Sequence, residues 1–214
     1  MECVAPAREP ARGRAHEAEA RVLSIPMGQG NKNLFLLDAI EFIDIEGHAA
    51  EFGVYKGGTL DVLARNLEGI VWGFDSFQGL PSAWVKSETL ERPKGHFATG
   101  ARPRGMPDNV RFAEGMFAHT LPEWKQRYEG PFRFMHVDCD IYESALEVLT
   151  ILNDRIVPGT VIVFDELVDD WAGAYPFWRD GEWRALNEWV ESHEREWECL
   201  MRCSTGQATI LITQ

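Results

Sequence analysis

Short apolar segments alternate with amphipathic segments along most of the chain. The apolar runs predict strands at residues 48–52, 70–75, 109–113, 132–138 and 160–164. Apolar residues at helical spacing predict helices at residues 31–43, 59–66, 117–128, 142–153 and 182–193. Strongly apolar strands that alternate with helices are typical of a parallel sheet with helices on both faces.

The last part of the chain departs from this alternation. Apolar runs at residues 197–203 and 207–213 are separated only by Ser204, Thr205 and Gly206. A connection this short can join only antiparallel strands. We therefore expect a Rossmann-like α/β fold, in which a seven-stranded and mostly parallel sheet ends in a C-terminal antiparallel hairpin.

Two segments lack a clear periodic pattern. Residues 82–107 are rich in Pro, Gly, Lys and Arg. A loop of this length in a compact domain is usually a lid, a binding loop or a disordered piece, and we expect a lid that covers the substrate. Residues 1–24 are rich in Ala, Arg and Glu, and we expect a flexible or marginally helical extension before one domain that spans residues 25–214.

The composition is that of a globular protein with a large core, since 45% of the 214 residues are hydrophobic. The formal charge of −13 argues against nucleic acid or an anionic membrane surface as a partner. The four cysteines form no CxxC pair, and residues 1–24 contain no apolar core of a secretory signal. We therefore expect reduced thiols and a cytoplasmic location.

A glycine-rich turn follows the first predicted strand. It reads Glu51-x-Gly53-x-x-x-Gly57-Gly58, and Asp75 ends the next strand. Glycines let a backbone approach a ligand closely, and an acid about 20 residues further on can hold the hydroxyls of a ribose. The dinucleotide-binding spacing G-x-G-x-x-G is absent here. The carboxylate of Glu51 would repel a phosphate and attract a cation, which favours S-adenosylmethionine with its sulfonium and ammonium groups.

Four predicted strands end in acidic residues, and ligands of open α/β sheets bind beyond these strand ends. The acids are Glu51, Asp75, Asp138 with Asp140, and Asp165 with Glu166. Each acid alone is also explained by exposure or helix capping, whereas the set on one rim favours a binding site. Clustered carboxylates repel one another unless a cation neutralises them, and oxygen ligands suit Mg²⁺ or Ca²⁺. Such an ion could also activate a substrate hydroxyl.

Five motifs in order give the chain a specific resemblance. They are Glu-Phe-Gly-Val-Tyr-Lys-Gly-Gly-Thr at 51–59, Phe-Asp-Ser-Phe-Gln-Gly-Leu-Pro at 74–81, Gly-Met-Phe-Ala-His-Thr-Leu-Pro at 115–122, His-Val-Asp-Cys-Asp-Ile-Tyr-Glu-Ser at 136–144 and Val-Phe-Asp-Glu-Leu at 163–167. Together they resemble the macrocin O-methyltransferase family (TylF/MycF-like) of class I S-adenosylmethionine-dependent methyltransferases. The similarity runs from residue 30 to residue 213. It implies S-adenosylmethionine and Mg²⁺ as cofactors and a small hydroxylated acceptor, as in the methylation of sugars during antibiotic biosynthesis.

The resemblance also implies roles for individual residues. The cofactor-binding set that it implies, together with the glycine turn, is Glu51, Gly53, Tyr55, Gly57, Thr59, Asp75, Ser76, Gly115, Met116 and Asp138. The implied metal ligands are Asp138, Asp165 and Glu166, with Asp140 as an additional acid. The best-known members of the family carry Asp-Asp at the last pair, where this chain has Asp165-Glu166.

The candidate catalytic residues are Asp138 and His136. His136 lies two residues before Asp138, so both point to the same face of a strand. His136 is either a base or a buried histidine that is hydrogen-bonded within the sheet. His96 in the long loop, which could reach a substrate if the loop closes, and His119 at a helix start are weaker candidates, as is Lys56, which is also explained as a solvent-facing residue.

Aromatic residues gather after the last acidic pair, at Trp171, Tyr175, Phe177, Trp178 and Trp183. They do not follow a helical stripe, so stacking on a substrate ring and an oligomer interface are equally good explanations.

The sequence therefore predicts an O-methyltransferase that acts on a hydroxyl of a small molecule, either a sugar or a natural-product intermediate, with assistance from Mg²⁺. We expect a homo-oligomer that binds neither nucleic acid nor membranes. Two alternatives stay open: an NAD(P)-dependent or nucleotide-sugar oxidoreductase, and a methyltransferase-fold protein that binds S-adenosylmethionine without catalysis.

Overall fold

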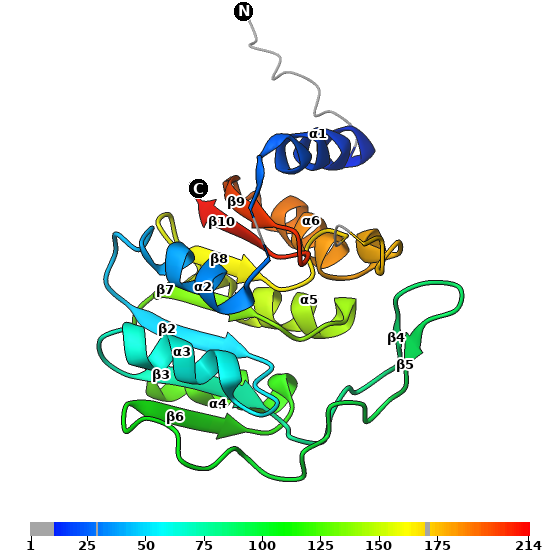
Figure 1. The fold of residues 1–214 in the computed structure, drawn as a ribbon. Helices are drawn as coiled ribbons and strands as arrows, with labels where there is room; N and C mark the ends of the chain where they lie inside the picture. The colour runs from blue at the N-terminus through cyan, green and yellow to red at the C-terminus, as the bar shows by residue number, and fades with distance from the viewer. Residues whose placement is uncertain (1–10, 29, 170–171) are drawn as a thin grey trace, which may run out of the picture.

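One large sheet runs through the computed structural model, which describes residues 11–28, 30–169 and 172–214 (Figure 1). Its strand order is β1-β9-β10-β8-β7-β2-β3-β6. The strands are β1 (Met27–Gly28), β2 (His48–Phe52), β3 (Val71–Asp75), β6 (Val110–Glu114), β7 (Phe132–Val137), β8 (Val161–Phe164), β9 (Trp197–Cys203) and β10 (Ala208–Ile212). A separate ribbon consists of β4 (Trp84–Val85) and β5 (Glu91–Arg92).

The strand directions confirm the predicted architecture. Strands β6, β3, β2, β7 and β8 are parallel to one another, whereas β10 is antiparallel to both β8 and β9. The seven predicted strands and the C-terminal hairpin are therefore present. The structure adds β1, whose two residues pair with Arg202 and Cys203 at the edge of β9. A two-residue edge strand is too short to leave a periodic pattern in the sequence.

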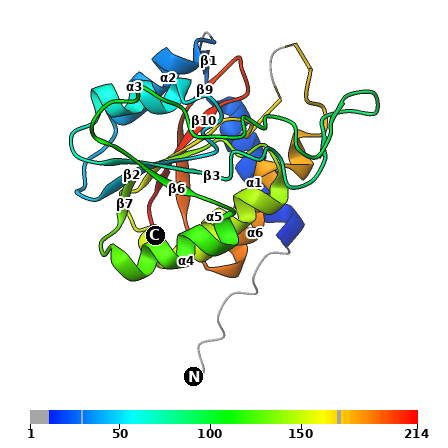
Figure 2. The ribbon, with the colours of Figure 1, turned by 90° about the horizontal axis from the view of Figure 1, so that it is seen from below.

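Helices cover both faces of this sheet. In Figure 2, α2 (Lys32–Ile40) and α3 (Gly58–Asn66) lie on one face, and α4 (Phe117–Arg127), α5 (Tyr142–Ile151) and α6 (Glu182–Ser192) lie on the other. The described residues also form α1 (Ala11–Ser24) and the short 3₁₀ helices η1 (Asn153–Arg155) and η2 (Trp178–Asp180). No described helix combines the length and the apolar character needed to cross a membrane.

Each face of the sheet has its own hydrophobic core. Leu36 of α2 and Leu60 of α3 pack on one side. Leu149 of α5, Trp189 of α6 and Phe52 of β2 belong to the core on the other side. All five side chains are fully buried, and each contributes about 1.5–3 kcal/mol relative to an exposed position. This two-sided burial explains why the strands read as continuous apolar runs.

The N-terminal segment contains a helix, which is one of the two forms expected for this extension. Residues 11–24 form α1, in which Val22 is fully buried. Near its end, the Arg202 guanidinium donates a hydrogen bond from Nε to the Ile25 carbonyl at 2.7 Å. These contacts join α1 to the outer part of the sheet. The expectation for residues 1–10 lies outside the described residues.

The predicted lid contains structure of its own. Residues 84–85 and 91–92 form the β4–β5 ribbon, which Figure 1 shows beyond the C-terminal ends of the central strands. The Phe177 amide donates to the Lys86 carbonyl at 3.2 Å, so the ribbon contacts the segment that precedes α6. Closure of this segment over a substrate stays a prediction.

Candidate active site

A cavity of about 380 Å³ opens at the C-terminal ends of the central parallel strands. Its size lies within the range of small-ligand sites. Seven of the predicted cofactor-binding residues line it: Gly53, Tyr55, Asp75, Ser76, Gly115, Met116 and Asp138. The parallel strands bring these residues together because their C-terminal ends meet at one edge of the sheet.

Gly53 lies where two strand ends come closest together. Its φ is +93°, and a Cβ atom at this position would lie 1.8 Å from the carbonyl oxygen of Asp138. A side chain would therefore have to displace the backbone of the neighbouring strand. The glycine allows the turn after β2 to pack directly against the end of β7.

Asp75 fixes the shape of the glycine turn from the neighbouring strand. Its Oδ2 accepts hydrogen bonds from the amides of Val54 at 2.7 Å and Tyr55 at 2.8 Å. Its Oδ1 accepts from the Phe77 amide at 2.7 Å. An ionised carboxylate offers about four acceptor positions, so Asp75 can hold the turn and still accept from a ligand in the cavity.

Three predicted cofactor residues do not line the cavity: Glu51, Gly57 and Thr59. Gly57 instead precedes α3 as its N-cap, with a left-handed φ of +79°, and Thr59 lies in the first turn of that helix. Glu51 is fully buried and faces His136. Its carboxylate is therefore used inside the sheet, and the structure does not support the expected contact with the cofactor's cationic groups.

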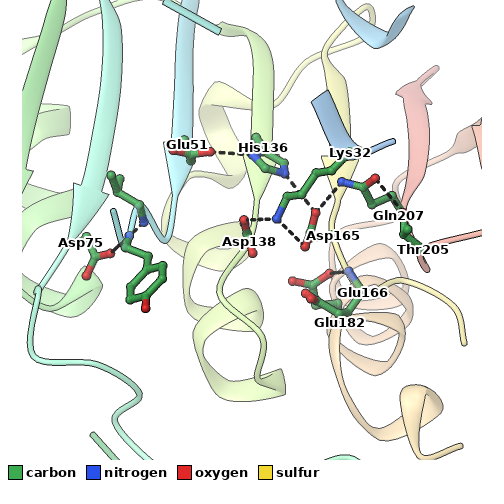
Figure 3. Close-up of polar contacts among 12 residues, drawn as sticks. Lys32, Glu51, Asp75, His136, Asp138, Asp165, Glu166, Glu182, Thr205 and Gln207 are labelled. Atoms are coloured by element: carbon green, nitrogen blue, oxygen red, sulfur yellow. Dashed lines mark hydrogen bonds and ion pairs between the residues drawn. The ribbon is translucent and has the colours of Figure 1, made fainter. Parts of the chain in front are cut away.

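His136 forms a buried pair with Glu51 (Figure 3). The two side chains are fully buried, and the His136 Nδ1 lies 2.8 Å from the Glu51 Oε1. On the other side of the ring, Nε2 lies 3.6 Å from the Asp165 Oδ1, too far for a hydrogen bond. Burial lowers the pKa of His136, but the carboxylates of Asp165 and Glu51 outweigh it and raise this pKa to about 10. A protonated imidazolium behind the cavity wall is not placed to act as a base, and the alternative of a hydrogen-bonded histidine within the sheet fits the geometry.

Lys32 is a further residue of the cavity, and it is not among the site residues predicted from the sequence. Its Nζ lies 2.7 Å from the Asp138 Oδ2 and 2.7 Å from the Asp165 Oδ2, so one ammonium joins the ends of β7 and β8 (Figure 3). Lys32 is the first residue of α2, after Asn31, whose Oδ1 caps the helix by accepting from the Leu34 amide. Phe35 and Leu36, three and four residues later, are buried. A lysine on the apolar face of a helix is the signal that could have revealed it.

The two aspartates that share this lysine differ in their pKa. Burial and the charge of Asp165 raise the pKa of Asp138 to about 6, against the opposing effect of Lys32. Burial also raises the pKa of Asp165, but the ammonium of Lys32 and the ring of His136 outweigh it and lower that pKa well below its usual range. At neutral pH both carboxylates are therefore ionised, and Asp138 is the one closer to accepting a proton.

The three predicted metal ligands line the cavity but do not form one ligand set. Both oxygens of Asp165 are engaged: Oδ2 by Lys32, and Oδ1 by the Gln207 Nε2 at 2.5 Å. Among the described residues, the oxygens that approach one another within 4.8 Å at this end belong to Asp138, Asp140 and Glu166. The set Asp138, Asp165 and Glu166 therefore does not fit a divalent ion in this structure.

Burial and neighbouring carboxylates raise the pKa of Asp140 and of Glu166 well above their ordinary values. Glu182, which the sequence analysis did not select, lies next to them. It is fully buried, and its Oε2 accepts a hydrogen bond from the Glu166 amide at 3.0 Å.

The remaining candidates do not line the cavity. His96, His119 and Lys56 are not among its lining residues, and the Lys56 ammonium instead lies 4.9 Å from the centre of the Tyr55 ring. The aromatic side chains of Tyr175, Trp178 and Trp183 are buried in the core beside α6, so packing explains them, contrary to both expected roles. Phe177 packs against the same core, and Trp171 lies outside the described residues.

Comparison with known proteins gives a consistent result. A family model described as a methyltransferase domain matches residues 50–167. One curated relative is 8-demethyl-8-(2,3-dimethoxy-alpha-L-rhamnosyl)-tetracenomycin-C 4'-O-methyltransferase of Streptomyces olivaceus, which is 28% identical over 59% of this chain and 55% of that protein. A second is mycinamicin III 3''-O-methyltransferase of Micromonospora griseorubida, which is 28% identical over 57% of this chain and 56% of that protein. The chain therefore spans about half the length of the curated relatives it matches.

The fold is similar to that of solved methyltransferases. The crystal structure of a calicheamicin methyltransferase superposes with a TM-score of 0.65 and covers 96% of this chain and 94% of its own. The two sequences are 18% identical, so this likeness concerns the fold alone.

Replacing Gly53 with alanine should destabilise the protein by about 2–5 kcal/mol, from the strain of a positive φ and the clash with the Asp138 carbonyl. Urea unfolding measures the effect. Gly58→Ala is the matched control, because a Cβ atom there would meet nothing within 4 Å. Equal stability of the two variants would contradict the packing described for Gly53.

The buried pair of Glu51 and His136 predicts a pH dependence of stability. The pKa of His136 is raised to about 10, so its contribution is fully present below the ordinary pKa near 6.5 and is lost as pH rises through about 10. Glu51→Gln should cost about 3–5 kcal/mol at neutral pH, because it leaves the imidazolium with one carboxylate fewer. It should also make the decline in unfolding free energy between pH 7 and pH 10 shallower. Denaturant unfolding across this range is the measurement, and parallel curves for the two proteins would refute the assignment.

Proposed function

Because the chain belongs to the methyltransferase-domain family whose model it matches, we propose that it is an S-adenosylmethionine-dependent O-methyltransferase. Its acceptor is a hydroxyl group of a small molecule, either a sugar or a natural-product intermediate. The observation that carries this proposal is the cavity where the Gly53 turn, Asp75 and Asp138 meet. The five motifs further support a place in the macrocin O-methyltransferase family (TylF/MycF-like) within this larger group.

The residues at the ends of β2 and β3 fit the cofactor. Gly53 leaves a wall without a side chain, and Asp75 holds the amides of Val54 and Tyr55 in place beside it. In the proposal, the remaining acceptor position of Asp75 binds a ribose hydroxyl, while Gly115 and Met116 border the adenine. S-adenosylmethionine, when bound, supplies a methyl group on a positively charged sulfur.

Asp138 is the residue that we assign as the base. It lines the cavity, and its pKa of about 6 allows it to be ionised at neutral pH and still to accept a proton. It takes the proton of the acceptor hydroxyl while the oxygen attacks the methyl group. The walls of the cavity contribute orientation, which supplies a large part of the rate in such transfers.

The lid supplies the outer part of the acceptor site. Trp84, Lys86, Arg92 and Phe97 line the cavity and come from residues 82–107. The ring of Phe97, which is only partly buried, offers a flat apolar surface of the kind on which a sugar or an aromatic ring packs. Closure of this segment would exclude water from a reaction in which opposite charges are neutralised.

Magnesium was part of the sequence-based expectation, on Asp138, Asp165 and Glu166. This set of three does not fit a metal, because the Lys32 ammonium lies between the first two carboxylates and the other oxygen of Asp165 accepts from Gln207. The proton transfer is assigned to the carboxylate of Asp138, which lines the cavity.

The two alternative functions receive no support from the comparisons. The family model describes a methyltransferase domain, and the curated relatives are named O-methyltransferases. Tight binding of NAD(H) would favour the oxidoreductase, and failure to methylate any hydroxylated acceptor would favour a binding protein without catalysis. Self-association stays a prediction, which the burial of Trp178 and Trp183 no longer supports.

Calorimetric titration with S-adenosylhomocysteine tests the cofactor site. The wild type should bind at micromolar affinity, and Asp75→Ala should weaken binding by about tenfold to a hundredfold, because hydrogen bonds to a carboxylate are lost. Asp61→Ala is the control, since this acid pairs with Arg65 on the outside of α3. Absence of wild-type binding, or equal binding by Asp75→Ala, would overturn the proposed site.

The assignment of Asp138 predicts how the rate of methyl transfer depends on pH. The rate should fall as pH drops through about 6, because the protonated carboxyl cannot accept a proton. The charged groups that face it and set this value are Lys32, Asp165, His136 and Glu51. Asp138→Asn should lower kcat by about 100-fold to 10,000-fold and remove this acid limb, as pH–rate profiles on a sugar acceptor would show. An acid limb that persists near pH 6 in the variant would exclude Asp138 as the base.

A further inference from the structure

We propose that the ammonium group of Lys32 takes the place of a divalent metal ion at the acidic end of the sheet, so that this methyltransferase works without a metal. The inference rests on the proposed function and concerns the same site. It makes Lys32 the residue that positions Asp138, the assigned base.

The geometry is that of a shared cation. The Lys32 Nζ lies 2.7 Å from one oxygen of each aspartate, and it belongs to a different element from either of them (Figure 3). The side chains of Asp138 and Asp165 are only 19% and 10% exposed. Two carboxylates this close and this poorly hydrated require a positive charge between them.

The rest of the contacts leave Asp165 without a free oxygen for a metal. Its Oδ1 accepts from the Gln207 Nε2 at 2.5 Å, and the ring of His136 lies 3.6 Å from the same oxygen. The Oδ2 belongs to Lys32. A metal on this aspartate would have to displace one of these donors.

The position of Lys32 in its helix is unfavourable unless the two carboxylates compensate for it. A cation in the first turn of a helix is unfavourable, because the N-terminal end of the helix dipole is positive. Lys32 nevertheless lies there, on the side that carries the buried Phe35 and Leu36. The attraction of the two carboxylates therefore outweighs the repulsion by the helix dipole and holds the ammonium at this place.

An ammonium can supply part of the chemistry of a metal ion. It neutralises Asp138 and Asp165 and fixes the direction of the Asp138 carboxylate. It carries three N–H donors, of which two point to the aspartates. The third is available to a hydroxyl oxygen of the acceptor, since Lys32 lines the cavity.

Titration with Mn²⁺, followed by electron paramagnetic resonance, tests this substitution on the metal-free full-length protein. The wild type and Lys32→Arg should show no saturable binding. Lys32→Ala should instead bind one Mn²⁺ saturably, because two buried carboxylates are left without a cation. Lys125→Ala is the matched control, since it removes a lysine paired with Asp154 away from the cavity and should leave Mn²⁺ binding unchanged.

Two results would overturn the inference. One is saturable Mn²⁺ binding by the wild type. The other is a Lys32→Ala variant that is folded by circular dichroism and still binds no Mn²⁺. The wild-type titration needs no variant, so the test survives if Lys32→Ala does not fold.

A second measurement addresses the reaction itself. Methyl transfer by the wild type should proceed at the same rate in EDTA as in Mg²⁺, and a rate that depends on Mg²⁺ would contradict the inference. Failure to bind S-adenosylhomocysteine would instead remove the proposed function and leave the Mn²⁺ result standing, so the two failures are distinguishable.

Discussion

Buried carboxylates at the C-terminal ends of β2, β7 and β8 require positive charges, and this requirement shapes the whole site. A charged group that leaves water without a partner costs several kcal/mol, so a buried acid must either meet a cation or stay protonated. Lys32 reaches Asp138 and Asp165 from α2, and His136 lies between Asp165 and Glu51. The helix α2, the sheet and the hairpin that carries Gln207 are held together at this point.

The same network divides the acids into two functional groups. Glu51 lies inside the sheet and stabilises the protonated form of His136. Asp75 and Asp138 reach the cavity, where the first shapes the glycine turn and the second has a pKa suited to proton transfer. A cofactor with a positively charged sulfur suits a cavity whose floor is acidic. The lid contributes the positively charged side chains of Lys86 and Arg92 to the outer part of the cavity.

Much of the fold and part of the site could be predicted from local patterns. The strands of the central sheet and the terminal hairpin are confirmed. The cofactor residues around Gly53 and Asp75 lie together because parallel strands end at one edge. The exceptions are instructive: Glu51 occupies a motif position but turns inward, and the aromatic residues before α6 pack into the core. Direction and burial of a side chain depend on neighbours that are distant in the sequence.

By itself, the sequence determined the α/β architecture, the position of the cavity and the set of acids at its edge. Each of these follows from periodicity or from strand order, which local residues control. The tertiary structure alone decided which cation each acid meets. Lys32 is 106 residues from Asp138 and 133 residues from Asp165 along the chain, and no local pattern encodes such a distance. The charge balance at the site emerges only when α2 packs on the sheet, because the apolar face of that helix brings the ammonium to the strand ends.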